Sequence, residues 1–113
     1  MARVDTYRKI VKEVLTSYGG DASFFEGVED QLIFDTEHDH YQLAKVGWSG
    51  QKRFFGSVIH IDIKDDKVWI QHDGTEHGVA NDLLERGVPK TDIVLAFHHP
   101  FQRELSGFAV GES

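Results

Sequence analysis

The sequence predicts an α+β fold. It consists of an N-terminal helix, a four-stranded antiparallel β-meander, a second helix and a short C-terminal strand or extended segment, with the helices packed on one sheet face. Two observations predict it. The hydrophobic period changes from three and four residues within 4–18 to two residues from position 29. The turns between the predicted strands are too short for the crossover that a parallel pair requires. With 113 residues, the whole chain, 1–113, is expected to form one domain.

The composition limits the classes of function. Twelve Lys and Arg residues against 19 Asp and Glu residues give a formal net charge of -7, which disfavours a protein that binds duplex DNA by itself. The absence of cysteine excludes disulfides and thiolate metal ligands. The N-terminus lacks the apolar region of a signal peptide, and no apolar run approaches the roughly 20 residues that span a bilayer. We therefore expect a cytoplasmic protein with no membrane partner.

The first predicted helix covers residues 4–18 and has one apolar face. Gly19 and Gly20 are expected to end it, because glycine readily adopts the left-handed conformation found just after a helix. Phe24 and Phe25 are expected to pin the following linker to the core. The apolar face is formed by residues spaced three and four apart: Val4, Tyr7, Val11, Val14 and Tyr18.

Four strands are predicted, at 29–35, 40–48, 52–64 and 67–73. A two-residue turn at Asp65-Asp66 places Ile63 opposite Val68, and the turn before Arg53 places that residue opposite Trp48. The face expected to form the core under the helices carries Ala44, Val46, Trp48, Phe55, Ile59, Ile61, Ile63, Val68 and Ile70. The opposite face carries Tyr41, Leu43, Phe54, Val58, His60, Asp62, Trp69 and Gln71.

The C-terminal third begins with a predicted helix. Thr75 is a suitable N-cap residue, and Gly87 with Pro89 forms a stop signal at the other end. The apolar run 93–97 is short and predicts a buried strand or extended segment. A helical turn laid on the core would explain the spacing of three apolar residues in the tail: Phe101, Leu105 and Phe108.

Seven histidines invite a metal-site hypothesis: His38, His40, His60, His72, His77, His98 and His99. No pair has the H-x-x-x-H or H-E-x-x-H spacing that presents two imidazoles on one helix face. In the predicted register His40 and His60 point to opposite sides of the sheet. We therefore interpret the histidines as structural or surface residues and predict no cofactor and no metal. A small metal-binding or hydrolytic enzyme that uses His and Asp residues stays open as an alternative.

The sequence contains no recognisable catalytic constellation. No serine lies in a G-x-S-x-G elbow. Asp62 and Lys64 on one strand only faintly resemble the carboxylates and lysine of a metal-dependent nuclease. We predict that the protein is not an enzyme and has no catalytic residues.

The mixed sheet face has two interpretations. Half-solvated antiparallel sheets commonly carry scattered aromatic side chains. Alternatively, an aromatic patch with a polar rim is typical of a protein interface. Aromatic side chains could also stack on single-stranded bases, so a direct nucleic-acid binding module is a further alternative, which the acidic charge disfavours. The candidate partner surface is formed by Tyr41, Phe54, His60, Asp62, Trp69 and Gln71.

Several separated blocks of the sequence resemble the XisI family, the fdxN element excision controlling factors of cyanobacteria. The blocks occur in the family's order: QLIFD (31–35), HYQLAKVGW (40–48), HIDIKDDKVWIQHDGTE (60–76), GVPKTDIVLAFHHPFQR (87–103) and FAV (108–110). The chain departs from the family at Asp65-Asp66, where Asp-Gly is frequent.

The resemblance implies an α+β fold with a central antiparallel sheet and brings no catalytic residues. It implies a control factor in the site-specific excision of a DNA element of the fdxN type during heterocyst differentiation, with a separate recombinase cutting and rejoining the DNA. An XisH-like protein, which looks nuclease-like, is the implied partner, so DNA would be contacted only indirectly. The sequence leaves a homo-oligomer open.

Overall fold

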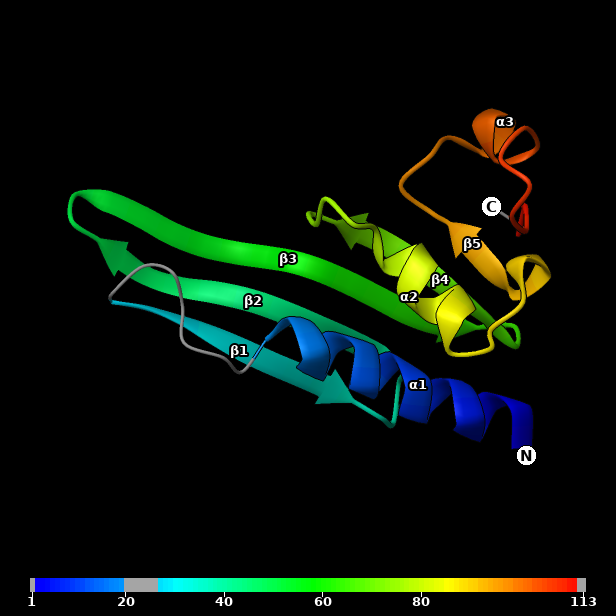
Figure 1. Ribbon diagram of the computed structural model, residues 1–113, viewed down its shortest axis with the longest axis horizontal. Coiled ribbons are helices and arrows are strands. Elements are labelled where there is room, and N and C mark those ends of the chain that lie inside the picture. The colour runs from blue at the N-terminus through cyan, green and yellow to red at the C-terminus, as the bar shows by residue number, and fades with distance from the viewer. Residues whose placement is uncertain (1, 20–26, 112–113) are drawn as a thin grey trace.

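The computed structural model describes residues 2–19 and 27–111, which form a five-stranded sheet with the first two helices on one face (Figure 1). The predicted α+β fold is confirmed. None of the helices in these two ranges is long and apolar enough to cross a bilayer. The elements run in this order: α1 (Ala2–Tyr18), β1 (Val28–Asp35), β2 (His40–Ser49), β3 (Lys52–Lys64), β4 (Lys67–Asp73), α2 (Val79–Glu85), a 3-10 turn (Lys90–Asp92), β5 (Ile93–Leu95) and α3 (Pro100–Arg103).

The sheet has the strand order β1-β2-β3-β4-β5. Strands β1 to β4 form the predicted antiparallel meander. The apolar run 93–97 contributes β5, which pairs with β4 in parallel, with α2 in the connection between the two strands. The prediction of a buried strand or extended segment is thus confirmed for Ile93–Leu95, whereas Phe97 at the end of the run is exposed. The parallel pairing of β5 makes the sheet mixed.

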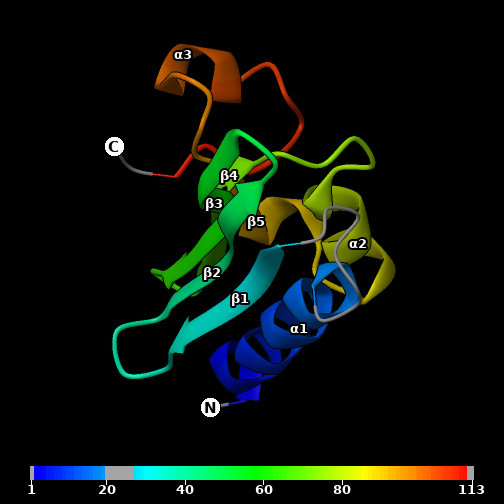
Figure 2. The same cartoon turned by 90° about the vertical axis from the view of Figure 1, so that its left-hand side faces the viewer.

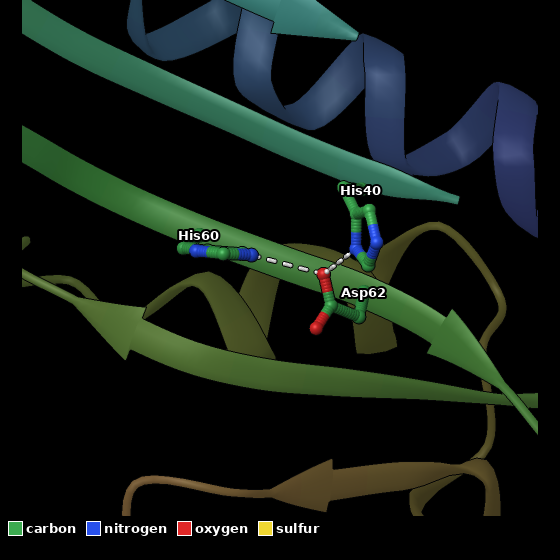
Figure 3. Close-up of side chains that lie close together, drawn as sticks. All are labelled: His40, His60 and Asp62. Atoms are coloured by element: carbon green, nitrogen blue, oxygen red, sulfur yellow. Dashed lines mark hydrogen bonds and ion pairs between the residues drawn. The ribbon is translucent and has the colours of Figure 1, made fainter. Parts of the chain in front are cut away.

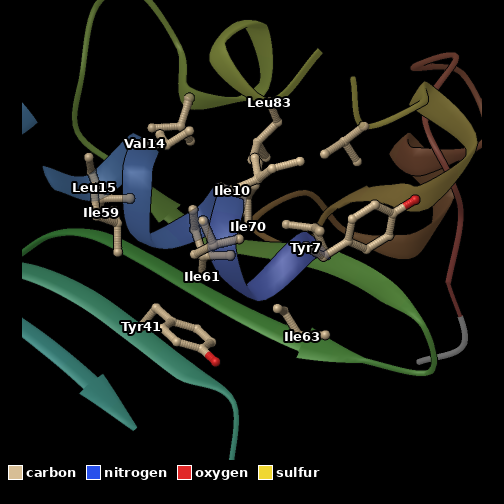
Figure 4. Packing of buried hydrophobic residues seen from close by; sticks show 14 of the residues in the cluster. Tyr7, Ile10, Val14, Leu15, Tyr41, Ile59, Ile61, Ile63, Ile70 and Leu83 are labelled. Atoms are coloured by element: carbon tan, nitrogen blue, oxygen red, sulfur yellow. The ribbon is translucent and has the colours of Figure 1, made fainter. Parts of the chain in front are cut away.

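Helices α1 and α2 lie beside each other on one side of the sheet, while α3 lies away from both (Figure 2). The apolar face of α1 is buried and shares a hydrophobic cluster with strands β2, β3 and β4 and with Leu83 of α2 (Figure 4). Each such side chain stabilises the fold by about 1.5–3 kcal/mol when fully buried. Phe24 and Phe25, expected to pin the linker, lie outside the described residues.

A β-bulge in β3 sets which side chains face the helices. Leu43 lies opposite Ile59 but Ala44 lies opposite Ser57, so Val58 is an extra residue with no partner in β2. Toward the β2–β3 turn the predicted register holds, and Trp48 lies opposite Arg53. Beyond the bulge, each β2 residue lies opposite a β3 residue one position further along than predicted. The bulge therefore reverses the faces of β2, and of the part of β3 before Val58, relative to Ile59 and Ile61.

The bulge makes part of the predicted face assignment wrong. Tyr41 and Leu43, predicted on the outer face, are 0% and 2% exposed in the core under α1, whereas Trp48 and Phe55, predicted in the core, are 56% and 75% exposed. The physical reason is that Tyr41 pairs with Ile61, which faces α1, so the alternate residues of β2 point outward. Ala44 and Val46, also predicted in the core, lie on the outer face with Trp48, where Val46 is half-buried. The remaining residues of the predicted core are buried under the helices: Ile59, Ile61, Ile63, Val68 and Ile70.

The connection into α2 differs from the prediction at its start. The helix begins at Val79, and Thr75 does not cap it. Instead Asp73 at the end of β4 accepts hydrogen bonds from the backbone N–H groups of Thr75, at 2.9 Å, and Val79, at 2.8 Å. The end is as predicted, because Gly87 adopts a left-handed φ of 102° just beyond the helix.

The C-terminal segment is organised by a buried arginine. Arg103 of α3 donates to the carbonyl oxygens of Ala96, His98 and Val110 at 3.2, 3.0 and 3.3 Å. The predicted helical turn exists as α3, but its position differs from the prediction: Phe101 and Leu105 are exposed, and only Phe108 packs against the core cluster.

Candidate functional site

Three polar side chains converge on the outer face of the sheet, the face opposite α1. His40 of β2 lies opposite Asp62 of β3, and His60 precedes Asp62 by two residues on the same strand, so all three point the same way. Nδ1 of His40 lies 2.8 Å from Oδ1 of Asp62, and Nε2 of His60 lies 2.9 Å from the same oxygen (Figure 3). We call these residues the His–Asp cluster.

The cluster contradicts the expectation that His40 and His60 point to opposite sides. That expectation followed from the register without a bulge, in which His40 would share the face of Ile61. The extra residue, Val58, places His40 opposite Asp62 instead. No spacing rule within one strand could reveal the cluster, because its ligand-type residues come from two strands whose relative register the bulge sets.

The carboxylate of Asp62 is held from both sides. While Oδ1 faces the two imidazoles, Oδ2 accepts a hydrogen bond from the side-chain amide of Gln71 on β4 at 3.2 Å. The hydrogen bond to Asp62, together with the carboxylate charge, raises the pKa of His40 above its ordinary value. The arrangement therefore favours an imidazolium beside a carboxylate.

Further histidines border the cluster. The ring of His38 stacks on that of His40, with centroids 6.5 Å apart and planes at 15°. His38 is itself paired with Asp35, with 2.9 Å between Nδ1 and Oδ2. His72 lies opposite His60 across β3 and β4. Imidazole groups thus gather on the outer face of β2, β3 and β4 and in the turn that precedes β2.

The aromatic residues of the predicted partner surface do not form an exposed patch on the outer face. Tyr41 lies in the core, where its hydroxyl donates to Asp39 at 2.8 Å. Phe54 lies opposite Gly47 and shares the helix-side face by alternation. Trp69 is on the outer face but only 4% exposed, because Gly111 and Arg103 of the C-terminal segment lie against its ring. These three placements correct the expectation of a contiguous patch of Tyr41, Phe54 and Trp69.

Three of the six predicted residues do lie accessibly on the outer face: His60, Asp62 and Gln71. Nothing in the structure tests their role in partner binding, so that role stays a prediction. Asp62 and Lys64, weighed as the carboxylate and lysine of a nuclease, contact different groups. Asp62 lies within hydrogen-bond distance of the two imidazoles, and the Lys64 ammonium lies 4.3 Å from the Trp69 ring centroid.

Another aromatic group occupies the outer face near the β2–β3 turn. The Arg53 guanidinium lies 5.4 Å from the ring centroids of both Trp48 and Phe55. Trp48 shares this face with His40, since both are even-numbered residues of one continuous strand. Sequence reasoning missed this group because it assigned the two aromatic residues to the core. The one local signal was Gly56 within the strand, since a glycine inside a strand often marks a bulge.

Comparisons with known proteins point to one family. The family model described as "XisI protein" matches residues 1–110. The crystal structure of a XisI-like protein from Anabaena variabilis ATCC 29413 is 44% identical, with a TM-score of 0.87 over 93% of this chain and 96% of that chain. The structure of fdxN element excision controlling factor XisI from the same strain is 35% identical, with a TM-score of 0.82 over 96% of this chain and 99% of that chain. No curated protein matches.

Proposed function

Because this chain belongs to the XisI family, we propose that it is a non-enzymatic control factor that regulates the excision of a DNA element through contacts with other proteins. The observation that carries the proposal is the similarity to the fdxN element excision controlling factor XisI over nearly the full length of both chains. The expected setting is site-specific recombination during heterocyst differentiation in a cyanobacterial cytoplasm. A separate recombinase cuts and rejoins the DNA.

The side-chain chemistry of the described residues supports a regulatory rather than a catalytic role. Asp62, the best-placed carboxylate for acid–base work, is engaged by His40, His60 and Gln71. The neighbouring hydroxyl of Ser57 donates to the Ile59 carbonyl oxygen at 3.1 Å and is not presented to an imidazole. This combination gives no activated nucleophile.

The proposed partner surface is the outer face of the sheet. It combines the exposed Trp48, Arg53 and Phe55 with the polar residues His60 and Gln71. Trp, Phe and Arg are enriched at the energetic centres of protein interfaces. Figure 1 shows that the turn between β2 and β3 lies well beyond α1 and α2, so no described helix covers the sheet there.

The partner is an XisH-like protein, and its contact surface carries basic residues. The formal net charge of -7 on this chain favours a positively charged partner and opposes direct contact with phosphates. DNA is therefore reached indirectly, through the partner or the recombinase.

Isothermal titration of the full chain with a purified XisH-like protein tests the proposal. We expect saturable binding. In parallel, fluorescence anisotropy with duplex DNA should show weak binding to the chain alone. Absence of binding to the XisH-like protein, together with tight and steeply salt-dependent binding to DNA, would overturn the proposal in favour of a direct nucleic-acid binding module.

A further inference from the structure

The His–Asp cluster has the composition of a transition-metal site. We propose that His40, His60 and Asp62 bind one zinc ion on the outer face of the sheet. Two imidazole nitrogens and one carboxylate oxygen form a donor set that suits Zn²⁺, which takes both ligand types in tetrahedral sites. The inference rests on the geometry of these three side chains and is independent of the role in excision.

The distances between the ligand atoms are close to those that a zinc ion imposes. One ligand-type atom from each of His40, His60 and Asp62 lies within 4.8 Å of those from the other two residues. The carboxylate oxygen lies 2.8 and 2.9 Å from the two nitrogens. Tetrahedral bonds of about 2.0 Å place ligand atoms about 3.3 Å apart, so in a zinc-bound site each of the two nitrogens would lie about half an ångström farther from the carboxylate oxygen.

The site is also supported by the residues around it. Gln71 holds the second oxygen of Asp62 at 3.2 Å and so fixes the carboxylate with Oδ1 turned toward both imidazoles. A hydrogen bond to the part of a ligand that does not touch the metal fixes the orientation of that ligand. The three ligands lie on neighbouring strands of the sheet, which hold them more rigidly than loops would. Because His40 is exposed, the fourth position is open to a water molecule.

A rival group in the described part of the chain is less suited to zinc. His77, Asp82 and Glu85 also bring ligand-type atoms within 4.8 Å of one another. This group has a single imidazole, 3.8 Å from Asp82, and the other Asp82 oxygen already accepts the hydroxyl hydrogen bond of Tyr18. His77 therefore provides a matched control, an exposed histidine beside a carboxylate but outside the proposed site.

Titration calorimetry of the full chain with ZnCl₂ tests the proposal. We expect one saturable site per chain. His60→Ala and Asp62→Asn should each weaken zinc binding at least about 100-fold, and Gln71→Ala about 10-fold, given the 10–100-fold cost of losing an outer-shell partner. His77→Ala should bind zinc as the unsubstituted chain does. Far-UV circular dichroism of each variant establishes that these surface changes leave the fold intact.

The absorption spectrum of the Co²⁺-loaded chain gives a second readout, since tetrahedral nitrogen and oxygen coordination produces intense visible bands that His60→Ala should abolish. The proposal is overturned by weak, non-saturating binding of zinc. It is equally overturned if folded His60→Ala and Asp62→Asn proteins keep full zinc affinity, or if His77→Ala is the change that removes it.

Discussion

Tyr41 joins the core to a polar network at the edge of the sheet. Its ring is fully buried, and its hydroxyl donates to Asp39, which also accepts a hydrogen bond from Nε of Arg8 on α1 at 2.8 Å. The buried hydroxyl is therefore satisfied and carries no desolvation penalty for an unpaired group. The network links the first helix to the turn before β2.

The stability of a Tyr41→Ala variant distinguishes the observed register, in which Tyr41 is buried, from the register without a bulge, in which it would lie on the outer face. Tyr41→Ala should lower the free energy of unfolding by about 3–5 kcal/mol, as for other buried aromatic residues. Phe55→Ala, at an exposed position, should change it by no more than about 0.5 kcal/mol. Urea denaturation of both variants measures the difference, and a larger loss for Phe55→Ala would contradict the face assignment.

The raised pKa values of two tyrosines predict how the free energy of unfolding changes at alkaline pH. Burial, followed by a hydrogen bond to Asp92, raises the pKa of Tyr7 to about 12, and burial with a hydrogen bond to Asp82 raises the pKa of Tyr18 to about 12. In the unfolded chain a tyrosine loses its proton near pH 10. The contribution of each phenol is therefore fully present below pH 10 and lost as the pH rises toward 12.

Tyr7→Phe tests this dependence because it keeps the ring and removes the ionisable group. The free energy of unfolding of Tyr7→Phe should fall less steeply between pH 10 and 12 than that of the unsubstituted chain. Urea denaturation at a series of pH values measures the two slopes. Equal slopes would show that Tyr7 does not contribute to the alkaline loss of stability.

The turn between β3 and β4 carries a local strain that one substitution should relieve. Asp65 and Asp66 have φ values of 55° and 62°, as a type I′ turn requires. Glycine adopts this conformation more readily than aspartate, so Asp66→Gly should raise the free energy of unfolding by about 0.5–1 kcal/mol. Asp66→Ala is the control, since it removes the carboxylate without relieving the strain. A thermal melt in which Asp66→Gly is the less stable of the two would contradict this account of the turn.

At the scale of the elements, periodicity and turn chemistry predict most of the fold. The change of period locates α1 and the strands, and Gly87 marks the end of α2. Gly56 signals a bulge in β3, but its position at Val58 could not be predicted, because an apolar residue in a strand of 13 residues fits either alternation. The start of α2 was missed for a related reason: the residue that satisfies its first N–H group, Asp73, lies six positions earlier, in β4.

At the scale of the whole molecule, the two faces of the sheet have different surroundings. One is covered by α1 and α2 and holds the core. On the other face the C-terminal segment covers Trp69, and this face presents the His–Asp cluster and the Trp48–Arg53–Phe55 group. The sequence correctly suggested an aromatic and polar outer face, but the bulge replaces Tyr41 and Phe54 with Trp48 and Phe55 as its aromatic residues.

The affinity of outer-face variants for an XisH-like protein tests the central claim most directly. The Trp48→Ala, Phe55→Ala double variant should stay folded, and titration calorimetry should show its affinity reduced at least about 10-fold, because truncated aromatic residues at an interface centre cost more than about 1.4 kcal/mol. Phe101→Ala, an equally exposed aromatic residue on α3, should bind unchanged. A folded double variant with full affinity would contradict the claim that this face receives the partner.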